Sequence, residues 1–264
     1  MGILNITPDS FFDGGRYLDP DAACAQAVKL VEAGADLLDL GAESTRPGAH
    51  LGTDKEELER LLPVLKRVRK EISIPLSIDT TRPEVAKKCL DAGADIINDV
   101  SGLKLSGREM AKVVKGFSAG IILMHSRGTP ETMQALTAYE AVVPDVMTEL
   151  RESVKLATGA GIEPERIVID PGLGFAKTAE QSLEILNNIN MFHALGFPLL
   201  AGPSQKSFVG KVTGREVKDR AFGTAACVAA CVREGVAILR VHDVGAMRDV
   251  IRMTEAIQQT TSAK

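Results

Sequence analysis

Residues 75–100 read "PLSIDTTRPEVAKKCLDAGADIINDV", and this stretch decides the fold. Two short apolar runs, 75–80 and 95–100, enclose a segment that Pro83 opens in the manner of a helix start. The sequence "AGAD" at 92–95 ends that segment with a glycine and leads at once into the second run. Both runs are too continuously apolar for a sheet with one solvated face, so we expect buried parallel strands joined by a helix.

The same unit is repeated along the chain. Six further apolar runs alternate with helical patterns, and they occupy residues 2–7, 36–41, 120–125, 166–171, 198–202 and 237–243. Eight strands that alternate with about eight helices over residues 1–264 predict a single-domain (β/α)8 TIM barrel of the α/β class. The alternative is a doubly wound sheet, but no GxGxxG motif follows the first run, so the main dinucleotide-binding signature is absent.

The composition of the chain restricts its partners. The 264 residues are 45% apolar and carry a formal net charge of -4. A mildly acidic protein does not attract nucleic acid or an anionic membrane electrostatically. The sequence has no signal peptide and no apolar run long enough to span a membrane, so we expect a cytoplasmic protein. Four cysteines lack metal-site spacing and are predicted to be buried reduced thiols, namely Cys24, Cys89, Cys227 and Cys231.

Polar residues gather where the predicted strands end. In a parallel barrel these carboxyl ends form the working face. Burying an unpaired polar group costs roughly 2–7 kcal/mol, so a shared site that pairs these groups is the simplest explanation. The residues are Asn5, Glu43, Asp79, Asn98, Asp99, His125, Asp170, Arg240 and His242.

Two sets of side chains predict the ligand. Asp79, Asn98 and Asp170 are rich in acceptors and suit a flat ligand edge that presents several N–H donors. Lys206, in the loop "GPSQKSFVG" (202–210), is a donor for a ring carbonyl or a ring nitrogen. These residues favour a donor-edged heterocycle.

The second set forms an anion site. Arg240 and His242 lie two residues apart on the last predicted strand, so their side chains leave on the same face. With the amide of Asn5 they make a compact site for a phosphate group carried by the heterocycle. Any Mg²⁺ would be held by oxygen ligands and by the substrate phosphate.

Other interpretations of these residues are weaker. His125 in "LMHSRG" has no evident partner in the sequence and is predicted to be structural. A Schiff-base lysine in a barrel stands at a strand end, whereas Lys206 lies beyond its strand among small loop residues. Lys206 also precedes Gly210 instead of following it, so the loop does not match a P-loop.

A longer series of motifs points to a known family. The chain contains, in order, "GILNITPDSFFDGG", "GAESTRPGA", "SIDT", "INDVSG", "MHSRGTPETMQ", "DPGLGFAKT", "KSFVG" and "RVHDV". From its second residue to Val244 the sequence closely resembles the bacterial dihydropteroate synthases. The resemblance implies a (β/α)8 barrel, usually a homodimer, that uses Mg²⁺. It implies that p-aminobenzoate is joined to 6-hydroxymethyl-7,8-dihydropterin diphosphate, giving 7,8-dihydropteroate and diphosphate. The electron-rich dihydropterin can stabilise a cation at the methylene carbon, so we expect an SN1-like path.

The resemblance also implies roles for individual residues. The pterin would be held by Asp79, Asn98, Asp170, Lys206 and Arg240. The diphosphate would be held by Asn5, Arg240 and His242, with Asn5 also touching Mg²⁺. The p-aminobenzoate site would be bordered by Thr45, Arg46, Phe175 and Ser207. The catalytic set would be Asp79, Asp170, Lys206, Arg240 and His242.

Loops and helices have implied roles as well. The loops that carry Asp9, Asp13 and Thr45 would close over both substrates and exclude water. The apolar run "FGTAACVAACV" (222–232) would form a dimer interface, with packing against the barrel as the alternative.

Two features depart from the family. Relatives usually carry an N-terminal segment over the bottom of the barrel, and this sequence begins almost on the first strand, so we expect that cover to be missing. At 204–207 the family has Ser-Arg-Lys-Ser, whereas this chain has Gln205 in place of the arginine. Either Gln205 faces away from the substrate, or it alters activity or the response to sulfonamides.

Two alternative functions stay open at this point. A methyltetrahydrofolate methyltransferase of the same superfamily shares the pterin residues but needs neither the diphosphate site nor the "STRPG" loop, and both are present. A non-catalytic pterin-binding paralogue would explain Gln205.

Overall fold

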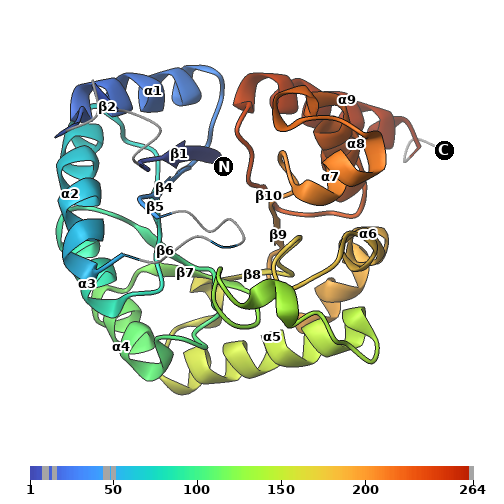
Figure 1. The fold of residues 1–264 in the computed structure, drawn as a ribbon, viewed down its shortest axis with the longest axis horizontal. Helices are drawn as coiled ribbons and strands as arrows, with labels where there is room; N and C mark the ends of the chain where they lie inside the picture. The colour runs from blue at the N-terminus through green and yellow to red at the C-terminus, as the bar shows by residue number, and fades with distance from the viewer. Residues whose placement is uncertain (8–11, 14–16, 44–47, 49–51, 262–264) are drawn as a thin grey trace.

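The computed structural model describes residues 1–7, 12–13, 17–43, 48 and 52–261, and these form a barrel (Figure 1). Its parallel strands are β1 (Gly2–Asn5), β4 (Leu38–Gly41), β5 (Leu76–Asp79), β6 (Ile96–Asp99), β7 (Gly120–Met124), β8 (Ile167–Asp170), β9 (Leu200–Ala201) and β10 (Ile238–Leu239). The first six pair in chain order, and β9 pairs with β10. Parallel bridges from Ile169 to Leu199 and from Gly2 to Val241 close the ring. The predicted α/β barrel and each of its predicted strands are confirmed.

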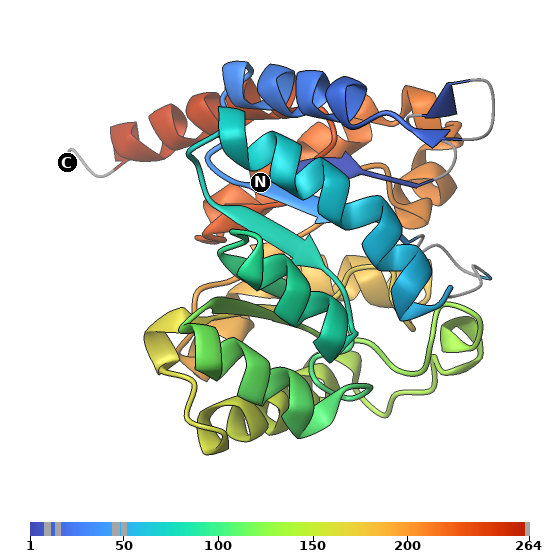
Figure 2. The same cartoon turned by 90° about the vertical axis from the view of Figure 1, so that its left-hand side faces the viewer.

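Helices surround the strands (Figure 1). They are α1 (Pro20–Glu32), α2 (Asp54–Glu71), α3 (Pro83–Asp91), α4 (Gly107–Phe117), α5 (Val142–Gly159), α6 (Ala179–Asn187), α7 (Ser207–Thr213), α8 (Ala221–Arg233) and α9 (Val244–Thr261). Short 3-10 turns are η1 (Met133–Ala135), η2 (Pro164–Arg166), η3 (Ile189–Leu195) and η4 (Val217–Asp219). Figure 2 shows α1 to α4 side by side on one flank, where each contacts the next.

Local sequence explains where several helices begin and end. Thr53 and Glu56 form a capping box at the start of α2, in which each side chain accepts from the other residue's backbone N–H. Gly34 and Gly93, the glycines of the two "AGAD" segments, have φ of +97° and +100°. This left-handed conformation turns the chain from a helix into the next strand, as the sequence predicts.

One small element was not predicted. After β1, the strands β2 (Phe12–Asp13) and β3 (Tyr17–Leu18) pair in an antiparallel ribbon. Strands of two residues are too short to show an alternating pattern, so the sequence gives no signal for them.

The barrel interior has an apolar floor and a polar upper part. The floor consists of Met1, Leu37, Ile96, Ile122, Val168, Leu200 and Ile238. Successive side chains on a strand alternate between the two faces, so residues two positions further along also point inward. From Leu37, Ile96, Val168 and Ile238 this step leads to Asp39, Asn98, Asp170 and Arg240. The site is therefore built directly on the apolar floor.

The expectation of buried thiols holds for three of the four cysteines. All four cysteines are free and lie in helices, three of them buried and Cys227 half-buried. Within the described part of the chain, no helix combines the length and the apolar character that crossing a membrane requires.

Candidate active site

Five of the predicted site residues meet at the carboxyl end of the barrel. Asp79 and Asp170 are the last residues of β5 and β8, and Asn98 is the last residue but one of β6. Asp79 pairs in register with Asn98. Arg240 follows β10 and places its Nη2 atom 3.1 Å from Oδ2 of Asp79. Lys206 precedes α7 and carries a charge that both Asp79 and Asp170 sense. Acceptors and cations thus share one polar cluster.

The carboxyl group of Asp79 has a raised pKa. Burial raises its pKa to about 7, and the negative charge of Asp39 acts in the same direction. The positive charge of Arg240 opposes this rise without cancelling it. Near neutral pH Asp79 can therefore either accept or donate a hydrogen bond.

Asp170 is held by its own exit loop. Its Oδ1 atom accepts a hydrogen bond of 2.7 Å from the backbone N–H of Gly172. Burial raises its pKa to about 6, although this hydrogen bond and the charge of Lys206 lower it. At neutral pH Asp170 is therefore mostly ionised and acts as an acceptor for a ligand.

Lys206 caps the N-terminus of α7 and faces an aromatic ring. Its Nζ atom lies 4.0 Å from the centre of the Phe175 ring. Burial and, to a smaller extent, the nearby charge of Arg240 lower the pKa of Lys206 to about 8. Phe175 and Lys206, from the exit loops of two different strands, therefore meet in space, whereas Ser207, the first residue of α7, is exposed.

Gln205 adopts an unusual backbone conformation. Its φ is +58°, in the left-handed region that few residues other than glycine adopt. Its N–H donates to Oγ1 of Thr224 over 3.1 Å, and its carbonyl accepts from Nη1 of Arg220 over 2.9 Å. Both contacts use the backbone of Gln205. They do not depend on which side chain stands at position 205.

Of the three predicted anion residues, Arg240 lies in the central cluster, and the other two are Asn5 and His242. Asn5 ends β1 and is exposed. Nδ1 of His242 lies 2.9 Å from Oγ of Ser204, which also accepts a hydrogen bond from the backbone N–H of His242. Ser204 therefore fixes the imidazole ring. Thr45 and Arg46, like Asp9, lie outside the described residues, and of Asp13 only the backbone is described.

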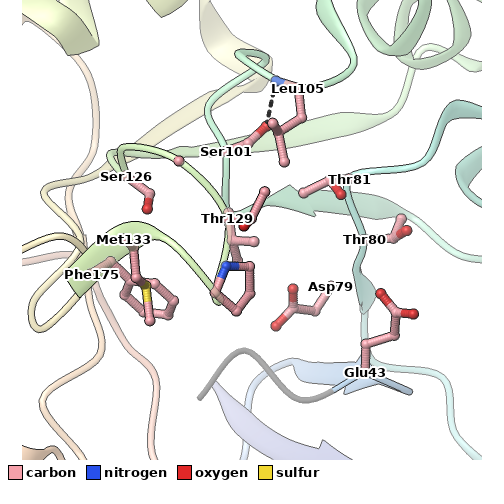
Figure 3. A pocket seen from close by; sticks show the side chains of 13 residues that line it. Glu43, Asp79, Thr80, Thr81, Ser101, Leu105, Ser126, Thr129, Met133 and Phe175 are labelled. Carbon is pink, nitrogen blue, oxygen red and sulfur yellow. Dashed lines mark hydrogen bonds between the residues drawn. The ribbon is translucent and has the colours of Figure 1, made fainter. Parts of the chain in front are cut away.

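A pocket opens beside this cluster (Figure 3). Residues that end or follow β4, β5, β6, β7 and β8 form it, and it joins Asp79 to Phe175. Hydroxyl groups line much of it, and Met133 contributes apolar surface. Its lining residues are Glu43, Asp79, Thr80, Thr81, Val100, Ser101, Leu105, Ser126, Gly128, Thr129, Pro130, Met133 and Phe175.

Two other polar strand ends support loops. Oε1 of Glu43 accepts from the backbone N–H of Gly52 over 2.9 Å, and its Oε2 atom lies 2.6 Å from Nη1 of Arg82. Asp99 is fully buried and accepts from Ser101 Oγ over 2.6 Å as well as from backbone groups of its own loop. These partners give Asp99 a structural role.

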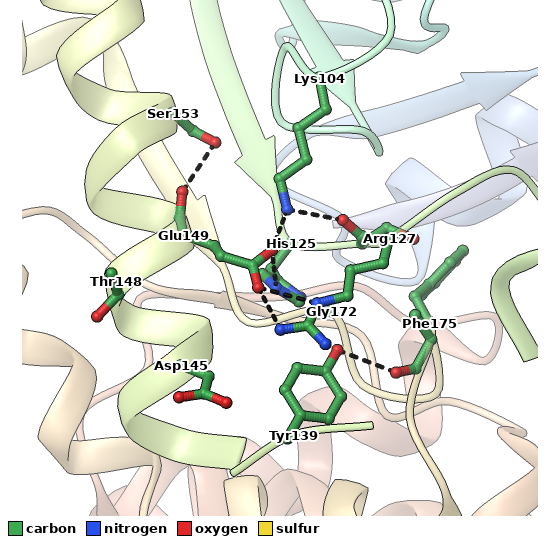
Figure 4. Close-up of polar contacts among 12 residues, drawn as sticks. Lys104, His125, Arg127, Tyr139, Asp145, Thr148, Glu149, Ser153, Gly172 and Phe175 are labelled. Carbon is green, nitrogen blue, oxygen red and sulfur yellow. Dashed lines mark hydrogen bonds and ion pairs between the residues drawn. The ribbon is translucent and has the colours of Figure 1, made fainter. Parts of the chain in front are cut away.

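His125 has partners that the sequence did not reveal, and Figure 4 shows its contact with Glu149. Its Nε2 atom lies 3.1 Å from Oε2 of Glu149, and its Nδ1 atom lies 2.9 Å from Nζ of Lys177. Burial lowers the pKa of His125 to about 3, and the charge of Lys177 adds to this effect, so the ring is neutral. Because a carboxylate only accepts, Nε2 carries the proton and Nδ1 accepts from Lys177. The structural role predicted for His125 agrees with this geometry.

Lys177 extends this chain of contacts to the loop after β8. Its buried amine also donates to the carbonyls of Gly172 and Phe175, over 3.0 and 2.9 Å. Glu149 is held in turn by Lys104 and by Arg127, whose Nε atom is 2.8 Å away. The network therefore fixes the loop that positions Asp170 and Phe175. The sequence-based prediction included neither Lys177 nor Glu149.

Asp39 is a further residue that the prediction missed. It lies within β4, has no exposed surface and accepts from Ser77, Asn98 and Arg240. The prediction considered only strand ends, whereas Asp39 lies two residues before the end of its strand.

Comparisons with known proteins agree with this geometry. A model of the family described as pterin binding enzyme matches residues 1–242. The dihydropteroate synthase of Synechocystis is 47% identical over 97% of this chain and 89% of its own length. That of Bacillus subtilis is 42% identical over 97% of this chain and 87% of its own length.

Solved structures give the same result. The dihydropteroate synthase of Clostridium difficile, crystallised in the presence of pteroic acid, superposes with a TM-score of 0.91 at 42% identity, covering 97% of this chain and 95% of that one. The Xanthomonas albilineans enzyme in complex with 7,8-dihydropteroate gives 0.87 at 38% identity, with coverages of 97% and 92%.

The barrel and its convergent polar cluster define a pterin-binding enzyme. The chain belongs to the dihydropteroate synthase family and is a transferase of folate biosynthesis. This membership decides against the methyltransferase alternative.

Proposed function

We propose that the chain joins 6-hydroxymethyl-7,8-dihydropterin diphosphate to p-aminobenzoate in the polar cluster described above. The observation that supports this most is the meeting of Asp79, Asn98 and Asp170 with two cations inside one barrel mouth. Three acceptors and a lysine donor match the donor-rich edge and the carbonyl of a pterin.

Asp79, Asn98, Asp170 and Lys206 would bind the pterin. The two carboxyl groups stabilise positive charge on the ring, and Lys206 donates to its acceptor atoms. Burial strengthens each of these interactions because water does not screen them.

Asn5, Arg240 and His242 would bind the diphosphate. Arg240 donates through Nε to Asp39 and through Nη2 to Asp79, and we assign its Nη1 atom to the substrate. His242, fixed by Ser204, contributes a second donor.

The described residues fit a Mg²⁺ ion that is held largely by substrate. They contain no group of three or more His, Cys, Asp or Glu side chains that could hold a metal. Mg²⁺ is commonly bound through one or two protein oxygens and the phosphates of a substrate, and the exposed amide of Asn5 offers such an oxygen. A bound ion would supply charge neutralisation for the diphosphate.

Phe175 and Ser207 would border the p-aminobenzoate, together with Thr45 and Arg46 outside the described residues. Among similar structures, the Xanthomonas albilineans enzyme binds 4-aminobenzoic acid and the Yersinia pestis enzyme binds a sulfonamide drug. The Phe175 ring beside Lys206 suits the flat face of an arylamine, and sulfonamides would compete for this position.

The chemistry follows from the cluster. The C–O bond between the methylene carbon and the diphosphate breaks, and its electron pair leaves with the diphosphate. The electron-rich dihydropterin carries the resulting cation, which Asp79 and Asp170 stabilise. The amine nitrogen of p-aminobenzoate then forms the C–N bond and releases one proton to solvent. A cation needs no strong nucleophile, so no strong general base is required.

Arg240→Ala tests these assignments. The variant should lose at least about a hundredfold in turnover, because leaving-group stabilisation of this kind contributes about 3 kcal/mol. Pterin affinity should fall by less than about tenfold. Arg248→Ala is the control, since Arg248 binds Gly34 and Asp36 away from the cluster. Near-normal turnover of Arg240→Ala would contradict the anion-site assignment.

A homodimer is also part of the proposal. Phe222 is 91% exposed at the start of α8, and Val212 on the adjoining α7 is 63% exposed. Burying such side chains against a second copy removes apolar surface from water. Phe222→Glu should convert a dimer into a monomer in analytical ultracentrifugation, whereas Met253→Glu on α9 should not. A wild type that sediments as a monomer would contradict the proposal.

A further inference from the structure

Asp39 lies at the centre of the polar cluster without reaching its surface. It has no exposed area, and its two carboxylate oxygens accept hydrogen bonds from β5, from β6 and from the residue that follows β10. Oδ1 accepts from Oγ of Ser77 over 2.6 Å. Oδ2 accepts from Nε of Arg240 over 2.6 Å and from Nδ2 of Asn98 over 3.2 Å.

The contact with Asn98 fixes the orientation of an amide. A buried carboxylate only accepts, so the Nδ2 atom of Asn98 must point toward Asp39. The Oδ1 atom of Asn98 is then the end of the amide presented to a ligand, and it can only accept. Asp39 therefore determines that Asn98 recognises a donor and rejects an acceptor at that place.

The contact with Arg240 fixes a cation. Arg240 crosses the barrel from the end of β10 to reach Asp39 on β4 and Asp79 on β5. A guanidinium held through two of its nitrogens keeps one plane, so its third nitrogen has a fixed direction. Without Asp39, Arg240 would retain only the ion pair with Asp79.

We propose that Asp39 is a positioning residue for the pterin diphosphate: it sets the acceptor face of Asn98 and holds Arg240 beside Asp79. This inference rests on the proposed function. Asp39 touches no substrate in this arrangement and acts through the residues that do.

Asp39 also influences the protonation of Asp79. The groups that face Asp79 are Asp39, Glu57, Arg240 and Lys206. The negative charge of Asp39 raises the pKa of Asp79, while Arg240 lowers it. Removing the charge of Asp39 lowers the pKa of Asp79 directly, and it also leaves Arg240 to pair with Asp79 alone. Both effects have the same sign.

The test is Asp39→Asn, assayed with both substrates across pH 5 to 10. An asparagine can donate to Oδ1 of Asn98 and turn its amide around. The KM for the pterin diphosphate should rise about tenfold or more, as expected when a charged hydrogen bond is lost, while the KM for p-aminobenzoate changes less than about threefold. The acid limb of the pH profile should move down by about one unit.

Asp99→Asn is the matched control, because Asp99 is an equally buried carboxyl group whose partners are loop residues. It should lower stability and leave the acid limb in place. If Asp39→Asn raises both KM values alike and leaves the acid limb unmoved, the positioning role is wrong.

A second pair of variants covers the case in which Asp39→Asn does not fold. The double variant Asp39→Asn/Arg240→Met removes both charges together. The midpoint of its acid limb should lie at a lower pH than the midpoint for Arg240→Met alone. Equal limbs would overturn the role of Asp39. A wild-type protein that binds the pterin diphosphate but makes no product would overturn the proposed function and not the role of Asp39. In that case the pH dependence of pterin binding would replace the pH dependence of activity as the measurement.

Discussion

The Nζ atom of Lys206 lies 4.0 Å above the ring of Phe175, although the two residues come from the exit loops of different strands. The contact places a cation whose pKa is lowered to about 8 against the aromatic face proposed for p-aminobenzoate. The same cluster contains two carboxyl groups whose pKa values are raised, to about 7 for Asp79 and about 6 for Asp170. Opposite shifts of this kind make catalysis depend on pH.

We expect a bell-shaped pH profile for kcat/KM of the pterin diphosphate. Activity should rise as Asp79 ionises near pH 7 and fall as Lys206 loses its proton near pH 8. Steady-state kinetics between pH 5 and 10 will measure both limbs. Lys206→Arg should remove the alkaline limb, because arginine stays charged. A profile that stays flat from pH 6 to 9 would contradict these assignments.

Asp79→Asn should stabilise the fold while it lowers activity. The pKa of Asp79 is higher in the folded protein, at about 7, than in the unfolded chain, at about 3.9. The folded state therefore holds the proton more tightly, and this group's contribution to stability is lost as pH rises from about 4 to about 7. An uncharged asparagine should raise the free energy of unfolding at pH 8 by about 1–3 kcal/mol and have little effect near pH 4. Urea titrations at the two pH values test this, and a loss of stability confined to pH 8 would contradict it.

Gly172→Ala should disrupt the loop after β8. Gly172 has φ of +70°, and a Cβ atom there would lie 2.0 Å from the carbonyl oxygen of His125. The matched control is Gly196→Ala, where φ is +82° but no atom lies within 4 Å of the added Cβ. We expect the control to cost about 1 kcal/mol for its backbone conformation, and Gly172→Ala to cost at least about 3 kcal/mol and most of the activity. If both variants lower the Tm by the same amount, the contact with His125 is unimportant.

Gln205→Gly should stabilise the turn that presents Lys206. Glycine adopts a φ of +58° without a steric penalty, so we expect a gain of about 1 kcal/mol with activity retained. Gln205→Arg should change activity less than about tenfold, because the contacts to Thr224 and Arg220 involve the backbone of residue 205. A larger gain from arginine would mean that the chain is a weakened synthase.

The sequence predicts the barrel well because each strand is a short apolar run, and all but β9 carry a polar residue at or just beyond the end of that run. The cluster of Asp79, Asn98, Asp170 and Arg240 follows from the rule that parallel strands end on one face. Asp39 escaped the prediction because it lies inside "DLLDLG" and not at its end. Asp39 stands two residues after Leu37, a residue of the barrel floor, so its side chain points into the barrel as well. This spacing predicts Asp39 only when the inward-facing positions of the strand are already known.

The partners of His125 show a second limit. Glu149 lies 24 residues away on α5, and Lys177 lies 52 residues away in the loop after β8. Helical spacing places Glu149 on a face of α5, but which residue that face meets depends on how the helix packs against β7. Likewise, the left-handed turn at Gln205 has no local signal, since neither Gly nor Asn stands there.

The most direct test of the central claim is product formation by the purified protein. The chain should be incubated with 6-hydroxymethyl-7,8-dihydropterin diphosphate, p-aminobenzoate and Mg²⁺, and both diphosphate and 7,8-dihydropteroate should be quantified over time. We predict equal amounts of the two products, with neither dihydropteroate nor sustained diphosphate release when p-aminobenzoate is left out. Binding of the pterin diphosphate without any release of diphosphate above background would contradict the account and identify a pterin-binding protein that does not catalyse the reaction.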